Sequence, residues 1–398
     1  MRLEDFPILK NNIIYFDNGA TTFKPQKVID KINEYYKEYT SNAHRGDYDY
    51  SLKVDTEYEN VRVKIKDFIN AKQKEEIVFT SGTTHSLNQV IFGYCSKILK
   101  EGDEVLISKA EHASNVLPWM ILSEKIGFNI KYIPLDSNYE INIEDVKKSI
   151  TDKTKIISLA HVSNVIGDIR PIKEIGSICK ERNILFIVDA AQSIGHLKID
   201  VEDMNIDFLA ASAHKMLGPT GTGFLYGKMD YLKETDPLMY GGGMNSYFES
   251  DFTYELKNVP LKFEAGTQNI AGVLGMGAAI DYLKEIGLDK IHEYEYELKK
   301  YAVSKLKEVP NIIIYNEKSK SGCLTFNIDK VFSQDTAVFL NNYNICVRSG
   351  NHCAKILKDE IGATNTCRAI FYLYNTKEEI DKFVEVLKMQ DKIYDNIV

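Results

Sequence analysis

A lysine and an aspartate each close a short apolar run in the middle of the chain. Lys215 ends the run Phe208-Leu-Ala-Ala-Ser-Ala-His-Lys, and Asp189 ends the run Phe186-Ile-Val-Asp. Parallel strands place ligand-binding residues beyond their carboxyl ends, so both side chains are expected at one sheet edge. A lysine there can form a Schiff base with pyridoxal 5′-phosphate (PLP), and a carboxylate can keep its pyridinium nitrogen protonated. The pair therefore predicts PLP chemistry, with an exposed loop lysine and a capping aspartate as the alternative.

A run of small, hydroxylated residues follows another apolar strand. Ser81-Gly-Thr-Thr comes directly after Ile77-Val-Phe-Thr and opens a predicted helix. Backbone N–H groups and the dipole at a helix start bind phosphate, although a plain N-cap has the same pattern. His112 could stack on the cofactor ring or be structural, and Gln192 is within reach of the phenolic oxygen. The cofactor-binding residues predicted from these runs are Thr83, Thr84, His112, Asp189, Gln192, Ser212, His214 and Lys215.

Cys353 differs from the other five cysteines in its surroundings. The run Arg348-Ser-Gly-Asn-His-Cys-Ala is typical of a polar loop, and His352 and Arg348 could stabilise a thiolate there. Cys353 is therefore a candidate nucleophile, with a small buried hydrophobe as the alternative. That structural interpretation is the better one for Cys95, Cys179, Cys323, Cys346 and Cys367.

A second arginine is a candidate for binding substrate. Arg368 precedes the apolar run Ala369-Ile-Phe-Tyr-Leu-Tyr, and a guanidinium suits bidentate binding of a carboxylate. A structural ion pair is the alternative. Asn164 follows another predicted strand, and His44-Arg45-Gly46 is a polar turn between two helical segments. The residues predicted to bind substrate are His44, Arg45, Asn164, Arg348, His352 and Arg368.

Composition narrows the class of protein. The formal net charge is −8, from 49 basic and 57 acidic residues, which argues against a nucleic-acid partner. The six cysteines contain no CxxC and match no zinc site or disulfide framework. No apolar stretch approaches the length of a membrane span, and the first residues lack a signal-peptide pattern. We therefore expect a cytoplasmic protein with reduced thiols and no membrane segment.

Short apolar runs alternate with helical patterns between about residues 75 and 230, which is typical of an α/β domain with a mainly parallel sheet. A long helical region over 272–309, with a break near Gly287, leads to a smaller α+β part. The predicted domains are 16–285, and 1–15 together with 286–398, the second carrying Cys353 and Arg368. The predicted strands of the large sheet are Glu76–Thr80, Glu104–Ser108, Ile130–Pro134, Lys155–His161, Leu185–Ala190, Phe208–Ser212 and Gly223–Tyr226. In the smaller part the predicted strands are Ile312–Tyr315, Cys323–Ile328, Ile345–Arg348 and Arg368–Tyr374, and the helices Gln334–Asn341 and Lys377–Lys388.

Taken together, the motifs resemble those of the cysteine desulfurases, in the group II or Suf-type branch of the class V, fold-type-I PLP enzymes. Their order and spacing match the family over nearly the whole chain. The matching runs are Tyr15-Phe-Asp-Asn-Gly-Ala, Ala43-His-Arg-Gly, Gly82-Thr-Thr, Glu111-His, Asn115-Val-Leu-Pro-Trp, His161-Val-Ser-Asn-Val, Val188-Asp-Ala-Ala-Gln, His214-Lys-Met-Leu-Gly-Pro-Thr-Gly, Gly241-Gly-Gly, Phe263-Glu-Ala-Gly-Thr-Gln-Asn, Arg348-Ser-Gly-Asn-His-Cys-Ala and Cys367-Arg-Ala. The departures are Asn351 where the family often has histidine, His85 where an acidic residue is common, and Lys355-Ile-Leu-Lys, which lacks a frequent proline.

The resemblance implies a seven-stranded fold-type-I sheet and a set of roles. Lys215, Cys353 and His112 are the implied catalytic residues, with Lys215 as the Schiff-base lysine and Cys353 as the nucleophile. The implied reaction converts L-cysteine to L-alanine and leaves the sulfur on Cys353 as a persulfide. An acceptor protein of the Suf system then takes the sulfur for iron–sulfur cluster assembly. Thr267 matches a threonine that reaches the PLP phosphate of a partner subunit, which implies a homodimer.

Three other functions compete with this interpretation. A selenocysteine lyase shares the cofactor residues and is poorly separated by sequence. An aminotransferase would leave Cys353 without a role. A non-catalytic scaffold for a sulfur-transfer partner would not need Lys215, Asp189 and Cys353 together.

Overall fold

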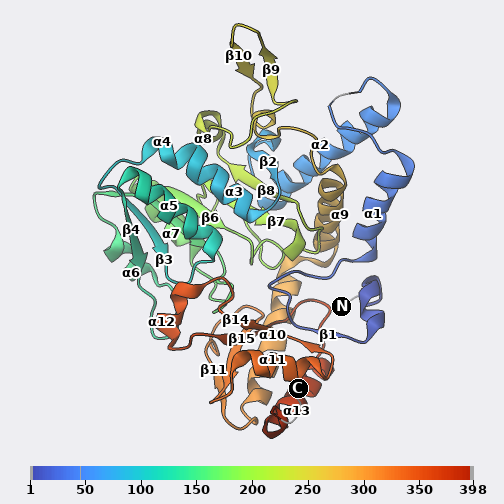
Figure 1. The fold of residues 1–398 in the computed structure, drawn as a ribbon, viewed down its shortest axis with the longest axis vertical. Helices are drawn as coiled ribbons and strands as arrows, with labels where there is room; N and C mark the ends of the chain where they lie inside the picture. The colour runs from blue at the N-terminus through green and yellow to red at the C-terminus, as the bar shows by residue number, and fades with distance from the viewer. Residues whose placement is uncertain (1–2, 45, 395–398) are drawn as a thin grey trace.

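The computed structural model describes residues 3–44 and 46–394 and is built around a seven-stranded sheet (Figure 1). All seven predicted strands are confirmed to within one residue at each end. Six of them run in the same direction, and β8 runs in the opposite direction between β2 and β7. From one sheet edge to the other the strands are β2 (Ile77–Thr80), β8 (Gly223–Gly227), β7 (Phe208–Ser212), β6 (Leu185–Asp189), β5 (Thr154–Ala160), β3 (Glu104–Ser108) and β4 (Asn129–Ile133).

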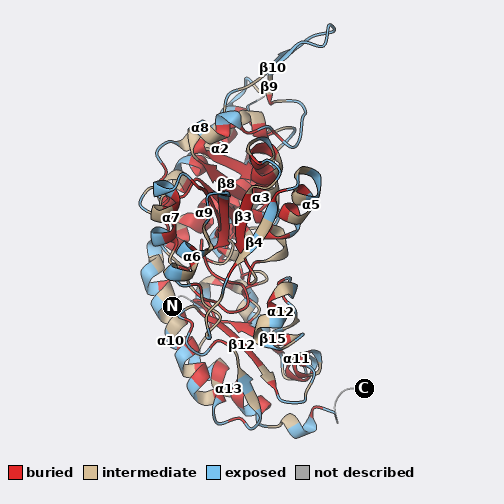
Figure 2. Cartoon of the chain, turned by 90° about the vertical axis from the view of Figure 1, so that its left-hand side faces the viewer, coloured by how far each residue is buried: buried red, intermediate tan, exposed pale blue. Residues whose placement is uncertain are grey.

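Helices cover both faces of this sheet, which is why its central strands are buried throughout (Figure 2). Successive side chains of a strand point to opposite faces. In β3, Leu106 accordingly joins the core beneath one set of helices, and Val105 and Ile107 join the core beneath the other. The first set is α1 (Gln26–Glu38), α2 (Asp49–Ile69), α6 (Ile143–Ser149), α7 (Ile172–Glu181) and α9 (Ile270–Ile286). The second set is α3 (Thr83–Val90), α4 (Ser96–Ile98), α5 (Leu117–Ile126) and α8 (Met229–Glu234).

A smaller antiparallel sheet with its own core lies beneath the large one (Figure 1). Two of its predicted strands differ in detail. The segment predicted as one strand over 345–348 forms two short strands. The last strand spans Thr366–Ile370 rather than Arg368–Tyr374, so Arg368 lies in its middle and the prediction was wrong at both ends. The strands are β11 (Ile312–Ile314), β12 (Cys323–Ile328), β15 (Thr366–Ile370) and β14 (Arg348–Gly350). The helices are α10 (Leu288–Leu306), α11 (Ser333–Asn341), α12 (Lys358–Ile361) and α13 (Lys377–Leu387).

The break predicted near Gly287 is confirmed, since α9 ends at Ile286 and α10 begins at Leu288. A hairpin that the sequence analysis did not predict extends from the top of the molecule, formed by β9 (Asn245–Phe248) and β10 (Tyr254–Leu256) (Figure 1). The remaining short elements are a π-helical turn over Ile91–Cys95 and 3-10 turns over Leu3–Asp5, Pro7–Asn11, Lys74–Glu76, Ala113–Asn115, Ala213–Lys215, Leu261–Phe263, Lys355–Leu357 and Gln390–Lys392. Among the described residues, no helix is long and apolar enough to cross a bilayer.

The amino-terminal segment joins the two cores. Strand β1 (Ile14–Tyr15) pairs in parallel with β13 (Ile345–Cys346), far away in the sequence. Phe16 lies in the smaller core against Phe371 and Phe383, whereas Phe6 packs in the larger one. The segment therefore contributes to both cores, and the predicted domain boundary stays a prediction.

Truncation of Phe16 tests how much the packing of the amino-terminal segment in the smaller core contributes to the stability of the fold. Phe16 is fully buried, so Phe16→Ala is expected to lower the free energy of unfolding by about 3–5 kcal/mol through lost burial and a residual cavity. Ile8→Ala is the control, because Ile8 is 40% exposed, and a change within about 0.5 kcal/mol is expected. Denaturant unfolding followed by circular dichroism measures both. Equal, small effects in the two variants would contradict that contribution.

Candidate active site

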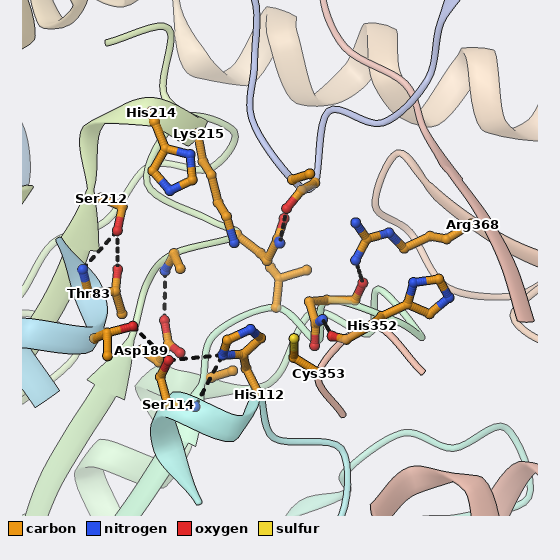
Figure 3. Close-up of a pocket in the computed structure, with 18 of the residues that line it drawn as sticks. Thr83, His112, Ser114, Asp189, Ser212, His214, Lys215, His352, Cys353 and Arg368 are labelled. Atoms are coloured by element: carbon orange, nitrogen blue, oxygen red, sulfur yellow. Dashed lines mark hydrogen bonds between the residues drawn. The ribbon is translucent and has the colours of Figure 1, made fainter. Parts of the chain in front are cut away.

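A cavity of about 300 Å³ opens where the carboxyl ends of the large sheet meet the smaller part of the chain. Figure 3 shows Lys215 extending into it and the sulfur of Cys353 pointing into it from the other side. The predicted site residues that line it are Thr83, Thr84, His112, Asn164, Asp189, Gln192, Ser212, His214, Lys215, Arg348, His352, Cys353 and Arg368. The lining residues to which the sequence analysis gave no role are Gly19, Ala20, Ser114, Ala160, Val162 and Ala191.

Lys215 and Asp189 face this cavity from neighbouring strands. β6 and β7 pair in parallel with Asp189 opposite Ala210, and the 3-10 turn after β7 carries Lys215. The Oδ1 atom of Asp189 accepts a hydrogen bond from the Ala191 N–H at 2.8 Å. Burial raises the pKa of Asp189 to about 6, and burial lowers the pKa of Lys215 to about 8 against the opposing attraction of Asp189. Desolvation thus moves both groups toward their neutral forms.

The start of α3 forms a concave polar wall of the cavity. Gly82 has a φ of 141°, and a Cβ there would lie 3.0 Å from the Ser212 hydroxyl, so only glycine fits without a shift. The Thr83 N–H donates to Ser212 Oγ at 2.8 Å, which ties α3 to the end of β7. Helix α3 has no side-chain cap. Apart from the Thr83 N–H, which already donates to Ser212, the N–H groups of its first turn and its positive dipole end are therefore available to an anion.

His112 is held as a neutral imidazole. Its Nδ1 accepts a hydrogen bond from the Ser114 N–H at 3.1 Å, so the neutral ring carries its proton on Nε2. Burial, together with the charge of Lys215, lowers the pKa of His112 to about 4. Ser114 also shares a 2.7 Å hydrogen bond with the Thr84 hydroxyl, which links His112 to the start of α3. The only sequence signal for Ser114 was its place two residues after His112.

Beneath His112 lies a fully buried ion pair between Glu111 and Arg170. Glu111 accepts hydrogen bonds from the Ala160 N–H at the end of β5 and from the Asn115 amide, each at 2.8 Å. Arg170 donates to the Ala160 carbonyl at 3.0 Å. The pair therefore fixes the turn that carries His112 to the sheet edge. The sequence analysis quoted Glu111 only as part of a motif and gave neither residue a role, because an ion pair between distant positions leaves no local pattern.

Arg368 is buried at the opposite wall. Its Nη1 donates to the Asn164 carbonyl at 2.8 Å, and its Nη2 lies 3.4 Å from Asp17 Oδ1. Arg348 is half exposed, and its Nε lies 3.1 Å from the same Asp17 oxygen. The side-chain amide of Asn164 donates to the His352 carbonyl at 2.7 Å, so it also supports the loop that carries Cys353. The cavity thus presents a positively charged wall to a carboxylate.

Hydrogen bonds hold the Cys353 loop on both sides, from the Asn164 amide on one side and from the Ala113 N–H on the other. The Cys353 carbonyl accepts a 2.8 Å hydrogen bond from the Ala113 N–H, next to His112. His352 and Cys353 both have positive φ, 53° and 57°, which costs energy in residues other than glycine. Cys353 itself is exposed to the cavity, whereas Cys95, Cys179, Cys323 and Cys367 are buried. The thiol is accessible, and its backbone is held in one position.

The structure corrects the expected effect of His352 on the thiol. The imidazole is buried, and its Nε2 lies 2.9 Å from the Thr366 hydroxyl. Burial and the charge of Arg368 lower the pKa of His352 to about 3. A neutral imidazole cannot stabilise the Cys353 thiolate through charge. His352 lines the cavity, but its ring supports the loop.

Two predicted residues lie elsewhere in this chain. His44 lines a separate pocket of about 110 Å³, together with Gly266 and Gln268. Thr267, between them, is exposed and accepts a 3.4 Å hydrogen bond from the Asn42 amide. Neither His44 nor Thr267 lines the cavity around Lys215. Arg45 lies outside the described residues.

Comparison with known proteins agrees with this geometry. The profile of the aminotransferase class-V family matches residues 14–383, so the chain belongs to that family. A probable cysteine desulfurase of Halalkalibacterium halodurans is 43% identical over 98% of both chains, and one of Staphylococcus aureus strain N315 is 41% identical over 98% of this chain and 96% of its own. The apo cysteine desulfurase of Thermococcus onnurineus NA1 superposes with a TM-score of 0.93 at 38% identity, over 98% of this chain and 97% of its own. The cysteine desulfurase CsdA of Escherichia coli has a TM-score of 0.92 at 32% identity, over 99% of this chain and 98% of its own.

The neutral state of His352 gives a testable pH dependence. A histidine whose folded pKa is about 3 carries no charge between pH 5 and 9, so it cannot create an acidic limb in that window. We expect His352→Gln to leave the midpoints of the activity–pH profile unchanged, even if the rate falls. Initial rates of product formation from L-cysteine measure this, with His85→Gln as a control outside the loop. If a midpoint of the activity–pH profile moves in His352→Gln but not in His85→Gln, a charged His352 does stabilise the Cys353 thiolate.

Proposed function

We propose that the protein is a PLP-dependent cysteine desulfurase, which converts L-cysteine to L-alanine and takes the sulfur onto Cys353. One observation carries the proposal: an exposed thiol lies in the same cavity as Lys215, Asp189 and Arg368. The relatives named cysteine desulfurases, similar over nearly the full length, support it. A transamination would give this thiol no task.

The described residues fit PLP, on which the aminotransferase class-V family depends. When bound, PLP supplies an electron sink for charge that develops on the substrate Cα. Lys215 would hold the cofactor covalently, and Asp189 would hold its ring nitrogen. The uncapped start of α3 would hold the phosphate with Ser212. His112, on the wall opposite Lys215, offers a neutral ring face (Figure 3).

Arg368 and Lys215 would act on the two ends of the substrate amino acid. The buried guanidinium of Arg368 binds the carboxylate and fixes the orientation of the substrate. A pKa near 8 leaves the Lys215 amine partly unprotonated at neutral pH. Lys215 is therefore suited to take the Cα proton and to return a proton to the carbon skeleton.

Sulfur transfer then balances without an external oxidant. The Cys353 sulfur attacks the substrate sulfur, an S–S bond forms and the substrate C–S bond breaks. The carbon skeleton keeps the electron pair of that bond, gains a proton and leaves as L-alanine. The pinned loop keeps the attacking sulfur in the cavity rather than on a flexible arm.

Removal of the thiol tests the proposal. Wild type with a thiol reductant is expected to release alanine and sulfide from L-cysteine in equal amounts, and Cys353→Ala to lose at least about 100-fold, because no acceptor remains for the sulfur. Cys346→Ala is the matched control, since Cys346 lies in β13 outside the cavity. Retained activity on cysteine in Cys353→Ala, with bound PLP, would contradict the proposal. Retained activity only on selenocysteine would favour a selenocysteine lyase.

We propose further that the enzyme is a homodimer in which Thr267 and the turn at His44 reach the partner's cavity. Both lie outside the cavity of their own chain. The projecting hairpin supports this, because its aromatic side chains are largely exposed, as such side chains are at protein interfaces. The exposed residues on and beside it are Tyr240, Tyr247, Phe248, Phe252 and Tyr254.

Subunit mixing tests the homodimer. Lys215→Ala lacks the cofactor lysine, and Thr267→Ala is expected to bind PLP more weakly in both its sites. In a mixed dimer, the site with intact Lys215 receives Thr267 from the other chain. Mixing the two variants after partial unfolding should therefore restore PLP affinity and activity in part, measured by cofactor absorbance and alanine release. A monomer by light scattering, or no recovery on mixing, would contradict the proposal.

The resemblance to the Suf-type branch supports two finer proposals. The persulfide sulfur passes to an acceptor protein of the Suf system for iron–sulfur cluster assembly. The enzyme works in the cytoplasm, where thiols stay reduced.

A further inference from the structure

Two arginines face each other across neighbouring strands at the cavity wall. In the antiparallel pair of β14 and β15, Arg348 lies directly opposite Arg368. Like charges in such cross-strand pairs repel each other. Arg368 is 2% exposed, so water cannot screen its charge effectively. The wall needs a counter-charge if both guanidinium groups are to stay in place.

Asp17 supplies that counter-charge. Its Oδ1 lies 3.1 Å from Arg348 Nε and 3.4 Å from Arg368 Nη2, and its Oδ2 lies 3.2 Å from Arg348 Nε. The backbone next to Asp17 is fixed as well, because the Ile370 N–H donates to the Phe16 carbonyl at 2.6 Å. A Cβ at Gly19 would lie 3.0 Å from Arg368 Nη2, so the same segment packs closely on the guanidinium.

We propose that Asp17 is a positioning residue for the substrate carboxylate, which holds Arg348 and Arg368 in place and limits their combined charge. Two guanidinium groups and one carboxylate leave a single positive charge, which matches an amino acid with one carboxylate. Arg368 Nη1 is anchored by the Asn164 carbonyl and Nη2 faces Asp17. The guanidinium is therefore fixed before the ligand arrives, which reduces the ordering that binding requires. This inference rests on the proposed function, because it refines the same cavity.

The test compares a ligand that has the carboxylate with one that lacks it. L-alanine and L-alaninamide differ only at this group, and calorimetric titration of PLP-loaded protein measures their affinities without turnover. We expect Asp17→Asn to weaken L-alanine by about tenfold, the scale of one charge-assisted hydrogen bond, and to leave L-alaninamide within about twofold. Arg368→Lys should show the same selective loss. Asp281→Asn, which removes an aspartate paired with Lys64 on the far helices, should change neither.

Kinetics provide a second measurement. In Asp17→Asn the KM for L-cysteine should rise while kcat stays within about threefold, because the lost interaction concerns binding of the carboxylate. Equal weakening of both alanine ligands would show a general structural defect and overturn the proposal. Tighter binding of L-alanine would overturn it too, because Asp17 would then be a competitor of the substrate.

A second variant keeps the proposal testable if Asp17→Asn folds poorly. Asp17→Glu keeps the charge but moves the carboxylate by one methylene, so L-alanine should again weaken selectively, and an unchanged ratio would overturn the proposal. Failure of the proposed function is a separate result. Wild type would then form no alanine from L-cysteine, while the comparison of L-alanine with L-alaninamide would still report on Asp17.

Discussion

Exclusion of water from Lys215 and Asp189 is the constraint on which the rest of the site depends. An amine of ordinary pKa would be almost entirely protonated at neutral pH and therefore a poor base. Burial beyond the end of β7 lowers the pKa of the Lys215 amine to about 8. Burial at the end of β6 raises the pKa of the Asp189 carboxyl to about 6. That burial exists only because helices cover both faces of the sheet and the smaller part of the chain closes its edge.

The reacting groups therefore come from two sheets, the large and the small one, which have separate cores. Lys215 and Asp189 belong to the large sheet, whereas Arg368 and Cys353 come from the smaller one. The two sheets are joined at the cavity itself, through the hydrogen bonds from Ala113 to Cys353 and from Asn164 to His352. The same hydrogen bonds that complete the cavity also fix the position of the Cys353 thiol. The thiol is therefore correctly placed only when the two sheets have come together.

The inner strands of the large sheet, such as β3, β6 and β7, were predictable because burial on both faces makes them largely apolar, a signal that needs no tertiary information. The residues at their carboxyl ends, such as Asp189 and Ser212, were predictable for the same reason. The hairpin of β9 and β10 was missed because exposed aromatic residues such as Phe248 and Phe252 do not follow the pattern of a half-buried strand. The sequence analysis gave Asp17 no role and expected a charge effect of His352, because the surroundings of both side chains depend on the tertiary fold. Asp17 lies beside Arg348 and Arg368, and the His352 ring is buried against Thr366.

The pairing of β1 with β13 has a consequence for how the molecule is made. Ile14 lies beside Ile345, so β1 leaves the ribosome long before β13 and can complete its hydrogen bonds only after the chain has been synthesised as far as β13. Domains usually form from the amino terminus during synthesis, and contacts between such distant residues form slowly. The seven-stranded sheet can assemble early, but the nascent chain cannot form the arginine wall until β14 and β15 have emerged. A ribosome-bound fragment that ends before β13 would thus already carry Lys215 and yet have no means of holding a carboxylate.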